Sequence, residues 1–122
     1  MKRLILLAFI SCLALAQTQE ASAQVFSTKL KITVLDDLGN VVKDARVTLY
    51  ASEADYNKEV NPVQPYKLTD SKGRVTFKNL DTKSYYVIVR KGDMDNSEGG
   101  EIISELSKGK VNKANVVISD GV

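Results

Sequence analysis

The sequence contains no histidine and no tryptophan, and its single cysteine is Cys12. Histidine-dependent triads and zinc sites of the usual His/Cys type need residues that the chain does not have. Its 17 basic and 15 acidic residues balance too closely to indicate a nucleic acid as the partner. The sequence therefore predicts a protein that is not an enzyme, with no catalytic residues, cofactor or metal.

The first residues have the pattern of a secretory signal peptide. Lys2 and Arg3 supply a positive start, an apolar stretch covers residues 4–16, and Ala21-Ser22-Ala23 offers small side chains before Gln24. The apolar stretch is shorter than the roughly 20 residues that a membrane-spanning helix needs. We expect residues 1–23 to be removed, so that residues 24–122 form one secreted or periplasmic domain without a transmembrane segment.

Cys12 leaves a second cellular location open, a membrane to which the protein is anchored by a lipid. Phe9-Ile10-Ser11-Cys12 loosely resembles the acceptor site of a bacterial lipoprotein, which would anchor the protein to a membrane through Cys12. The match lacks the expected leucine where Phe9 stands, and apolar residues continue from 13 to 16, where a mature lipoprotein usually becomes polar. Secretion without a lipid is the favoured prediction.

Alternating apolar and polar residues predict β-strands along the rest of the chain. The residues expected to point inward are Leu30, Ile32, Val34, Ala45, Val47, Leu49, Val75, Phe77, Tyr85, Val87, Val89, Ala114, Val116 and Ile118. Turn residues separate these segments, and no long amphipathic helix interrupts them. We therefore predict an all-β fold, an antiparallel β-sandwich of six or seven strands.

Three further segments connect or border these strands. Residues 51–65 lose the alternation and hold both prolines, which predicts the longest loop, with room for one helical turn. Residues 66–69 and 75–77 flank the turn Asp70–Gly73 and are predicted to form a hairpin. Residues 101–106 fit an edge strand or a helical turn, and we interpret them as a strand.

Several stretches resemble a known family, the carboxypeptidase regulatory-like domain. They are "KITVLDDLGNVVKDARVTLY", "LTDSKGRVTFKNL" and "SYYVIVRKG", and the similarity covers most of the mature chain. The resemblance implies a transthyretin-like (prealbumin-like) Greek-key sandwich and a module that accompanies other activities without catalysis. Such a likeness indicates the fold better than the function.

A sister family, the collagen-adhesin B-type domains, links a first-strand lysine to a last-strand asparagine. In this chain Lys29 and Lys31 are expected to face outward, beside inward apolar residues, and Asn115 also falls on the outward face. The sequence departs from that pattern, and no such crosslink is expected.

Acidic residues gather at two places. Asp93, Asp95, Glu98 and Glu101 are hard oxygen ligands of the kind that Ca²⁺ prefers, but their spacing does not fit a twelve-residue calcium loop. We interpret residues 93–101 as a solvated loop, which leaves calcium binding there undecided. Asp36 and Asp37 are interpreted as part of a turn rather than as a catalytic pair.

Two functions remain open. The favoured one is a non-catalytic structural or interaction module that binds a cell-envelope or extracellular protein through the 51–65 loop and the adjoining sheet edge. The alternative is a module that binds a carbohydrate or another small ligand through this loop and exposed tyrosines, with Tyr85 expected in the core. The five tyrosines are Tyr50, Tyr56, Tyr66, Tyr85 and Tyr86. We also expect that deleting residues 55–63 leaves the melting temperature nearly unchanged.

Overall fold

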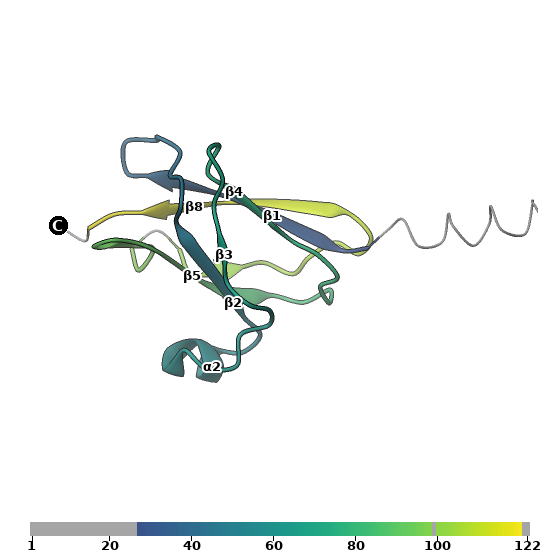
Figure 1. Cartoon of the computed structure of the whole chain (residues 1–122). Helices are drawn as coiled ribbons and strands as arrows, with labels where there is room; N and C mark the ends of the chain where they lie inside the picture. Colours follow the sequence, from purple (N-terminus) through teal and green to yellow (C-terminus); the bar gives the residue numbers. More distant parts are fainter. Residues whose placement is uncertain (1–26, 99, 121–122) are drawn as a thin grey trace, which may run out of the picture.

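The computed structural model describes residues 27–98 and 100–120, which form two stacked β-sheets (Figure 1). One sheet has the strand order β4-β1-β8, and the other has the order β3-β2-β5-β6, with β7 also paired to β5. The elements are β1 (Lys29–Asp36), β2 (Arg46–Tyr50), α2 (Glu53–Lys58), β3 (Lys67–Leu68), β4 (Arg74–Phe77), β5 (Tyr85–Lys91), β6 (Met94–Asp95), β7 (Ile102–Ile103) and β8 (Val111–Ile118). The predicted all-β sandwich is confirmed.

The core lies between the sheets and is formed by the alternate residues of each strand. Every residue predicted to face inward is buried except Ala114, which is partly buried and packs against the core. Tyr85 and Phe77 are the largest fully buried side chains. The Tyr85 hydroxyl donates a hydrogen bond to the Asp81 carbonyl at 3.0 Å, so its polar end is satisfied.

One strand pair differs from the predicted antiparallel arrangement. β8 lies parallel to β1, in register from the pair Lys29 and Val111 to the pair Asp36 and Ile118. Alternation of apolar residues is the same in either chain direction, so it could not predict this orientation. The other strand pairs in the described residues are antiparallel.

The predicted hairpin around residues 70–73 is wrong, although the turn is present. The Gly73 amide donates to the Asp70 carbonyl at 2.9 Å. However, β3 pairs with β2 and β4 pairs with β1, so the turn joins two sheets. Buried Thr69 explains the change of sheet, because its hydroxyl donates to the Val42 carbonyl at 2.6 Å and accepts from the Ala45 amide at 2.8 Å. These bonds hold the chain beside β2 until the turn begins.

The described part of the chain contains eight strands, of which β3, β6 and β7 have only two residues each. The predicted edge strand at residues 101–106 is therefore confirmed only for Ile102–Ile103, which pair with β5. Among the described residues, no helix has the length and apolar character to cross a membrane. The predicted leader and Cys12 lie outside the described residues.

Candidate functional site

Residues 51–65 contain a short capped helix rather than only an irregular loop. The Ser52 side chain accepts a hydrogen bond from the Asp55 amide at 3.2 Å and caps the start of α2. Glu59 ends the helix in the left-handed region, with φ of 54°, and its amide reaches the carbonyls of Asp55 and Tyr56. The predicted helical turn is thus present.

The end of this segment is bound to the sandwich. The Val63 amide donates to the Leu49 carbonyl at 2.9 Å, and the Gln64 side chain donates to the Lys78 carbonyl at 2.7 Å. Val63 also packs against the hydrophobic core. The segment 51–65 is therefore held against the sandwich at its carboxyl-terminal end.

A charged pair fixes the middle of the segment. The Arg90 guanidinium on β5 donates two hydrogen bonds to the Glu59 carboxylate, at 2.6 and 2.9 Å. These hydrogen bonds lower the pKa of Glu59 and raise the pKa of Arg90. The two side chains are 44% and 51% exposed, so the pair stabilises the fold by about 1 kcal/mol at most.

Three tyrosines form the contact between α2 and the second sheet. Tyr56 of α2 meets Tyr50 of β2 edge-on at 6.2 Å between ring centres and Tyr86 of β5 at 5.4 Å. Loss of solvent around Tyr56, followed by its hydrogen bond with Glu101, raises the pKa of its hydroxyl to about 12. These rings are used in packing, so deletion of residues 55–63 would remove part of it and is expected to lower the melting temperature. The sequence-based expectation of an unchanged melting temperature is revised accordingly.

Tyr66 differs from the other tyrosines because it is exposed. Its side chain is 52% exposed, and the Arg46 guanidinium lies over its ring, 4.5 Å from the ring centre. Tyr85, in contrast, is in the core as predicted. Tyr66 is thus the aromatic ring best placed to meet a ligand or partner.

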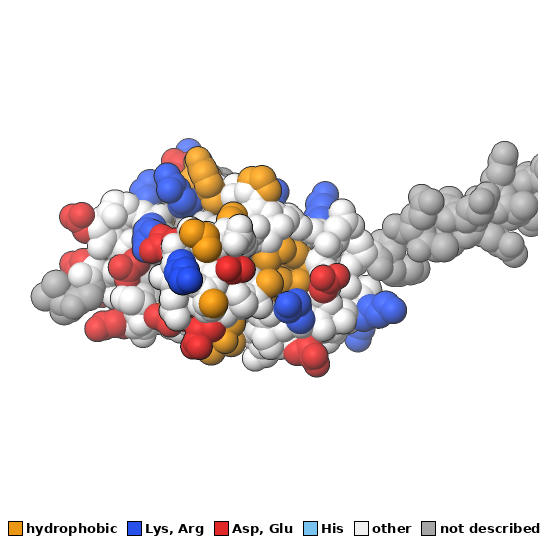
Figure 2. Space-filling view, turned by 90° about the horizontal axis from the view of Figure 1, so that it is seen from below, with side chains coloured by type: hydrophobic (Ala, Val, Ile, Leu, Met, Phe, Trp, Pro, Cys, Tyr) orange, Lys and Arg blue, Asp and Glu red, His pale blue; other side chains and the backbone are white. Residues whose placement is uncertain are grey.

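A groove of about 300 Å³ lies between residues 51–65 and the outer face of β2 and β5. We call it the loop groove; its lining includes Arg46, Tyr50, Glu59, Pro62, Tyr66 and Arg90. Figure 2 shows the molecule from the side of α2, where hydrophobic side chains lie among acidic and basic ones. The loop groove borders the edge strand β3, whose Leu68 is exposed. It combines two aromatic rings, two guanidinium groups and a carboxylate.

Two acidic residues of the 93–101 loop, Asp95 and Glu101, already have hydrogen-bond partners. Asp95 accepts hydrogen bonds from the Ser97 amide at 3.0 Å and hydroxyl at 2.7 Å, which lower its pKa. Glu101 bonds with Tyr56 instead. Across residues 27–98 and 100–120, no three His, Cys, Asp or Glu side chains gather in a way that could hold a metal ion.

Sequence reasoning missed Asn96, which organises this loop. Its buried side chain accepts from the Val89 amide at 2.9 Å and donates to the carbonyls of Val87 and Gly100, both at 2.9 Å. A lone asparagine in a polar loop carries no periodic signal that marks it as buried. β6 ends at Asp95, and from there the side-chain amide of Asn96 takes the place of a backbone hydrogen-bond partner for β5.

Asp36, Lys31 and Asn115, which the sequence analysis considered as possible site residues, have structural roles or lie on the outer face of a strand. The Asp36 carboxylate accepts from the amides of Asn40 at 2.8 Å and Leu38 at 3.0 Å, and these bonds lower its pKa and build the predicted turn. Lys31 lies on the outward face of β1, and Asn115 is exposed on β8. The residues inward on β1 are apolar, so no lysine of this strand enters the core for a crosslink.

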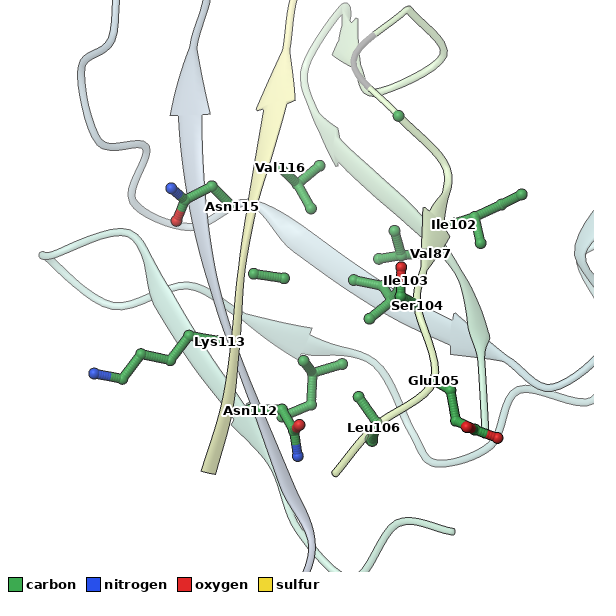
Figure 3. A pocket seen from close by; sticks show the side chains of 13 residues that line it. Val87, Ile102, Ile103, Ser104, Glu105, Leu106, Asn112, Lys113, Asn115 and Val116 are labelled. Carbon is green, nitrogen blue, oxygen red and sulfur yellow. The ribbon is translucent and has the colours of Figure 1, made fainter. Parts of the chain in front are cut away.

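A second hollow lies at the open side of the sandwich, between β7 and β8. Figure 3 shows Val87, Ile103, Leu106 and Val116 beside this cavity, whose volume is about 350 Å³. The Asn112 side chain bonds to the backbone of residue 107 at one end, and the backbones of residues 95 and 119 pair at the other. The hollow is a short gap between sheet edges, and it lies away from the residues of the loop groove.

Parts of several solved bacterial proteins are similar in structure to this chain. BcpA, the major pilin subunit of Bacillus cereus, matches with a TM-score of 0.52 and 15% identity, over 78% of this chain and 30% of that one. The group B streptococcus pilus 2b backbone protein matches with a TM-score of 0.49 and 14% identity, over 75% and 40%. For the Bacillus anthracis TIE protein the TM-score is 0.48 and the identity 18%, over 75% and 16%. The chain thus spans less than half the length of each. At 15% identity, the likeness to BcpA shows a shared fold only.

No curated protein sequence matches the chain at a significant level. The sequence pattern of the family described as "DR_A0283-like, Ig-like domain" matches residues 24–122. This match covers more than half of the chain and agrees with the two-sheet sandwich seen here. The chain therefore belongs to the DR_A0283-like family of Ig-like domains.

Proposed function

We propose that the chain is a secreted, non-catalytic interaction module that binds a cell-envelope or extracellular protein through the loop groove and the adjoining β3 edge. The observation that carries this proposal is the half-exposed Tyr66, whose ring lies under the Arg46 guanidinium in the lining of the loop groove. Residues 51–65, which form the opposite wall, are held to β5 by the hydrogen bonds between Arg90 and Glu59. Tyrosine and arginine are enriched among the residues that dominate protein interfaces. An ordered wall also loses little conformational entropy on binding.

The non-catalytic part of the proposal rests on how the polar groups are used. Glu59 is paired with Arg90, Asp95 bonds to Ser97, and Asp36 holds a turn. A general acid or base needs a titratable group within reach of a substrate and a second group to assist it. The groups with shifted pKa values in the loop groove instead stabilise the fold.

The proposal that the protein is secreted rests on the signal-peptide pattern of residues 1–23. The finer assignment to carboxypeptidase regulatory-like domains rests on the three sequence stretches quoted above. BcpA is by its name a pilin subunit, and an extracellular structural role for this chain agrees with that likeness of fold. Cleavage before Gln24 would release a domain whose partner lies outside the cytoplasm.

Carbohydrate binding is the second candidate. Tyr66 offers an exposed ring, and the guanidinium and carboxylate groups of the loop groove offer hydrogen bonds for sugar hydroxyls. Arg46 already covers one face of the Tyr66 ring, and the Arg90–Glu59 pair uses donors and acceptors that a sugar would need. These contacts favour a protein partner over a glycan.

The test compares three forms of the chain with equal expression and equal melting temperature. The forms are wild type, the double variant Tyr66→Ala with Arg46→Gln, and the control Leu38→Ala, which changes a residue that is 83% exposed in the turn after β1. Each is used to capture cell-envelope proteins and is applied to a glycan array. We expect one protein that wild type and the control retain and the double variant loses at least tenfold.

Two results would contradict the proposal. Retention of the same protein by the double variant would place binding elsewhere. Glycan binding that the double variant abolishes, without any captured protein, would replace the leading proposal by the second candidate.

A further inference from the structure

The outer face of the three-stranded sheet, opposite to the loop groove, carries a cluster of positive side chains. Lys31 of β1, Arg74 of β4 and Lys113 of β8 line one hollow of about 140 Å³, together with Thr33 and Asn115. We call it the cationic hollow. Each strand contributes through the residues that alternate with its buried ones. In Figure 3, Lys113 and Asn115 leave β8 on the side away from Ile103 and Leu106.

The strand register brings these charges together. Lys31 and Lys113 are direct neighbours in the parallel pair of β1 and β8. Thr33 lies between Arg74 on one side and Asn115 on the other. Like charges that face each other across strands destabilise a sheet. The cluster thus imposes a cost on the fold unless an anion accompanies it.

One carboxylate interacts with this cluster. The ion pair between Arg90 and Glu59 involves the other sheet and none of these three cations. Asp70 senses the charge of Arg74, but its carboxylate already accepts hydrogen bonds from the amides of Lys72 at 2.8 Å and Arg74 at 3.0 Å. One carboxylate engaged in a turn leaves the three cations with an excess of positive charge.

We propose that the cationic hollow binds a phosphate group. A guanidinium recognises phosphate oxygens with paired donors, and lysine ammonium groups act as point charges toward them. Thr33 and Asn115 add a hydroxyl and an amide that donate without further charge. A doubly charged tetrahedral anion suits three cations that line one hollow better than a single carboxylate does. The phosphate belongs to a soluble phosphate polymer or to a lipid headgroup, which share this chemistry.

The test measures binding of short-chain polyphosphate by calorimetry, and of phosphatidylglycerol and phosphatidylcholine vesicles by sedimentation. The site variant combines Lys31→Gln, Arg74→Gln and Lys113→Gln. The control combines Lys58→Gln, Lys83→Gln and Lys91→Gln, which changes the net charge equally away from the cationic hollow. All forms have the same N-terminus and are checked for an unchanged circular dichroism spectrum.

We expect wild type and control to bind phosphate with affinities within about threefold of each other, and the site variant to lose at least tenfold. The dependence of log K on the logarithm of the salt concentration should become shallower in the site variant, because fewer counterions are released when the phosphate contact is lost. Site-dependent binding to polyphosphate alone identifies a soluble phosphate, and site-dependent binding to phosphatidylglycerol identifies a headgroup; both support the proposal. Equal weakening in the two triple variants, or no binding to either probe, would overturn it. Neither failure would affect the loop groove, which lies on the other sheet.

Discussion

Glu59 and Arg90 are 31 residues apart in the chain, and their side chains meet through two hydrogen bonds of 2.6 and 2.9 Å. Glu59 is the residue at which α2 ends, and Arg90 lies on β5 of the second sheet. The pair therefore fastens the segment that forms one wall of the loop groove to the sheet that forms its floor.

This pair predicts a specific dependence of stability on pH. Hydrogen bonding from Arg90 lowers the pKa of Glu59 below its ordinary 4.5. A carboxyl group with a lowered pKa in the folded state stabilises the fold above its unfolded pKa, and that contribution is lost as the pH falls through its folded pKa. Glu59→Gln should reduce the free energy of unfolding by about 0.2 to 1 kcal/mol at neutral pH. The difference from wild type should shrink as the pH falls below the ordinary glutamate pKa of 4.5.

Urea unfolding at a series of pH values measures this difference. Glu105→Gln, at an exposed glutamate outside the pair, is the matched control and should follow wild type at every pH. A Glu59→Gln variant that matches wild type at neutral pH would show that the pair does not stabilise the segment.

Asn96→Ala should destabilise the domain by about 1 to 3 kcal/mol. The change leaves the buried Val89 amide and Val87 carbonyl without the side chain that bonds to them, and a buried unpaired polar group costs roughly this amount. Asn57→Ala removes an exposed asparagine of α2 and should change stability by less than about 0.5 kcal/mol. If the two variants unfold at the same urea concentration, Asn96 does not organise the loop.

Gly73→Ala should be more destabilising than Gly39→Ala. Both glycines have positive φ, 74° and 88°, so an added side chain is strained at either position. A Cβ at residue 73 would also lie 2.8 Å from the Val34 carbonyl oxygen, whereas a Cβ at residue 39 meets nothing within 4 Å. We expect the loss at residue 73 to be larger by at least about 1 kcal/mol in thermal or urea unfolding. Equal losses would mean that the approach of the Gly73 turn to β1 is looser than described.

The exported protein should begin at Gln24, because Ala21 and Ala23 provide the small side chains that a signal peptidase accepts. Intact mass of the protein recovered outside the cytoplasm checks this. A chain that begins at Cys12 and carries a diacylglycerol group would contradict it and would place the domain on a membrane.

The alternation of apolar and polar residues predicted correctly which side chains of each strand face the core, because successive side chains of a strand point to opposite faces. It could not predict the direction of β8, nor the crossing from β3 to β4, since both depend on contacts between residues far apart in the chain. Thr69 determines that crossing through bonds to residues 42 and 45.

The candidate site was predictable in part for similar reasons. Prolines and lost alternation marked residues 51–65 as the longest connection, and the structure shows the loop groove beside it. Alternation placed Tyr85 in the core, but for the other four tyrosines no sequence signal distinguished packing from exposure. The Tyr56 ring is engaged in packing because α2 places it against Tyr50 and Tyr86. Tyr66 precedes an edge strand and stays exposed.

The most direct test of the proposed function is photo-crosslinking from the loop groove in intact cells. A photoreactive phenylalanine analogue replaces Tyr66 in one chain and Leu38 in another, since both residues are at least half exposed, Tyr66 just before β3 and Leu38 in the turn after β1. We predict that illumination links the chain to one cell-envelope or extracellular protein from position 66 and not from position 38. A protein linked from position 38 and never from position 66 would contradict the assignment of the loop groove as the binding surface.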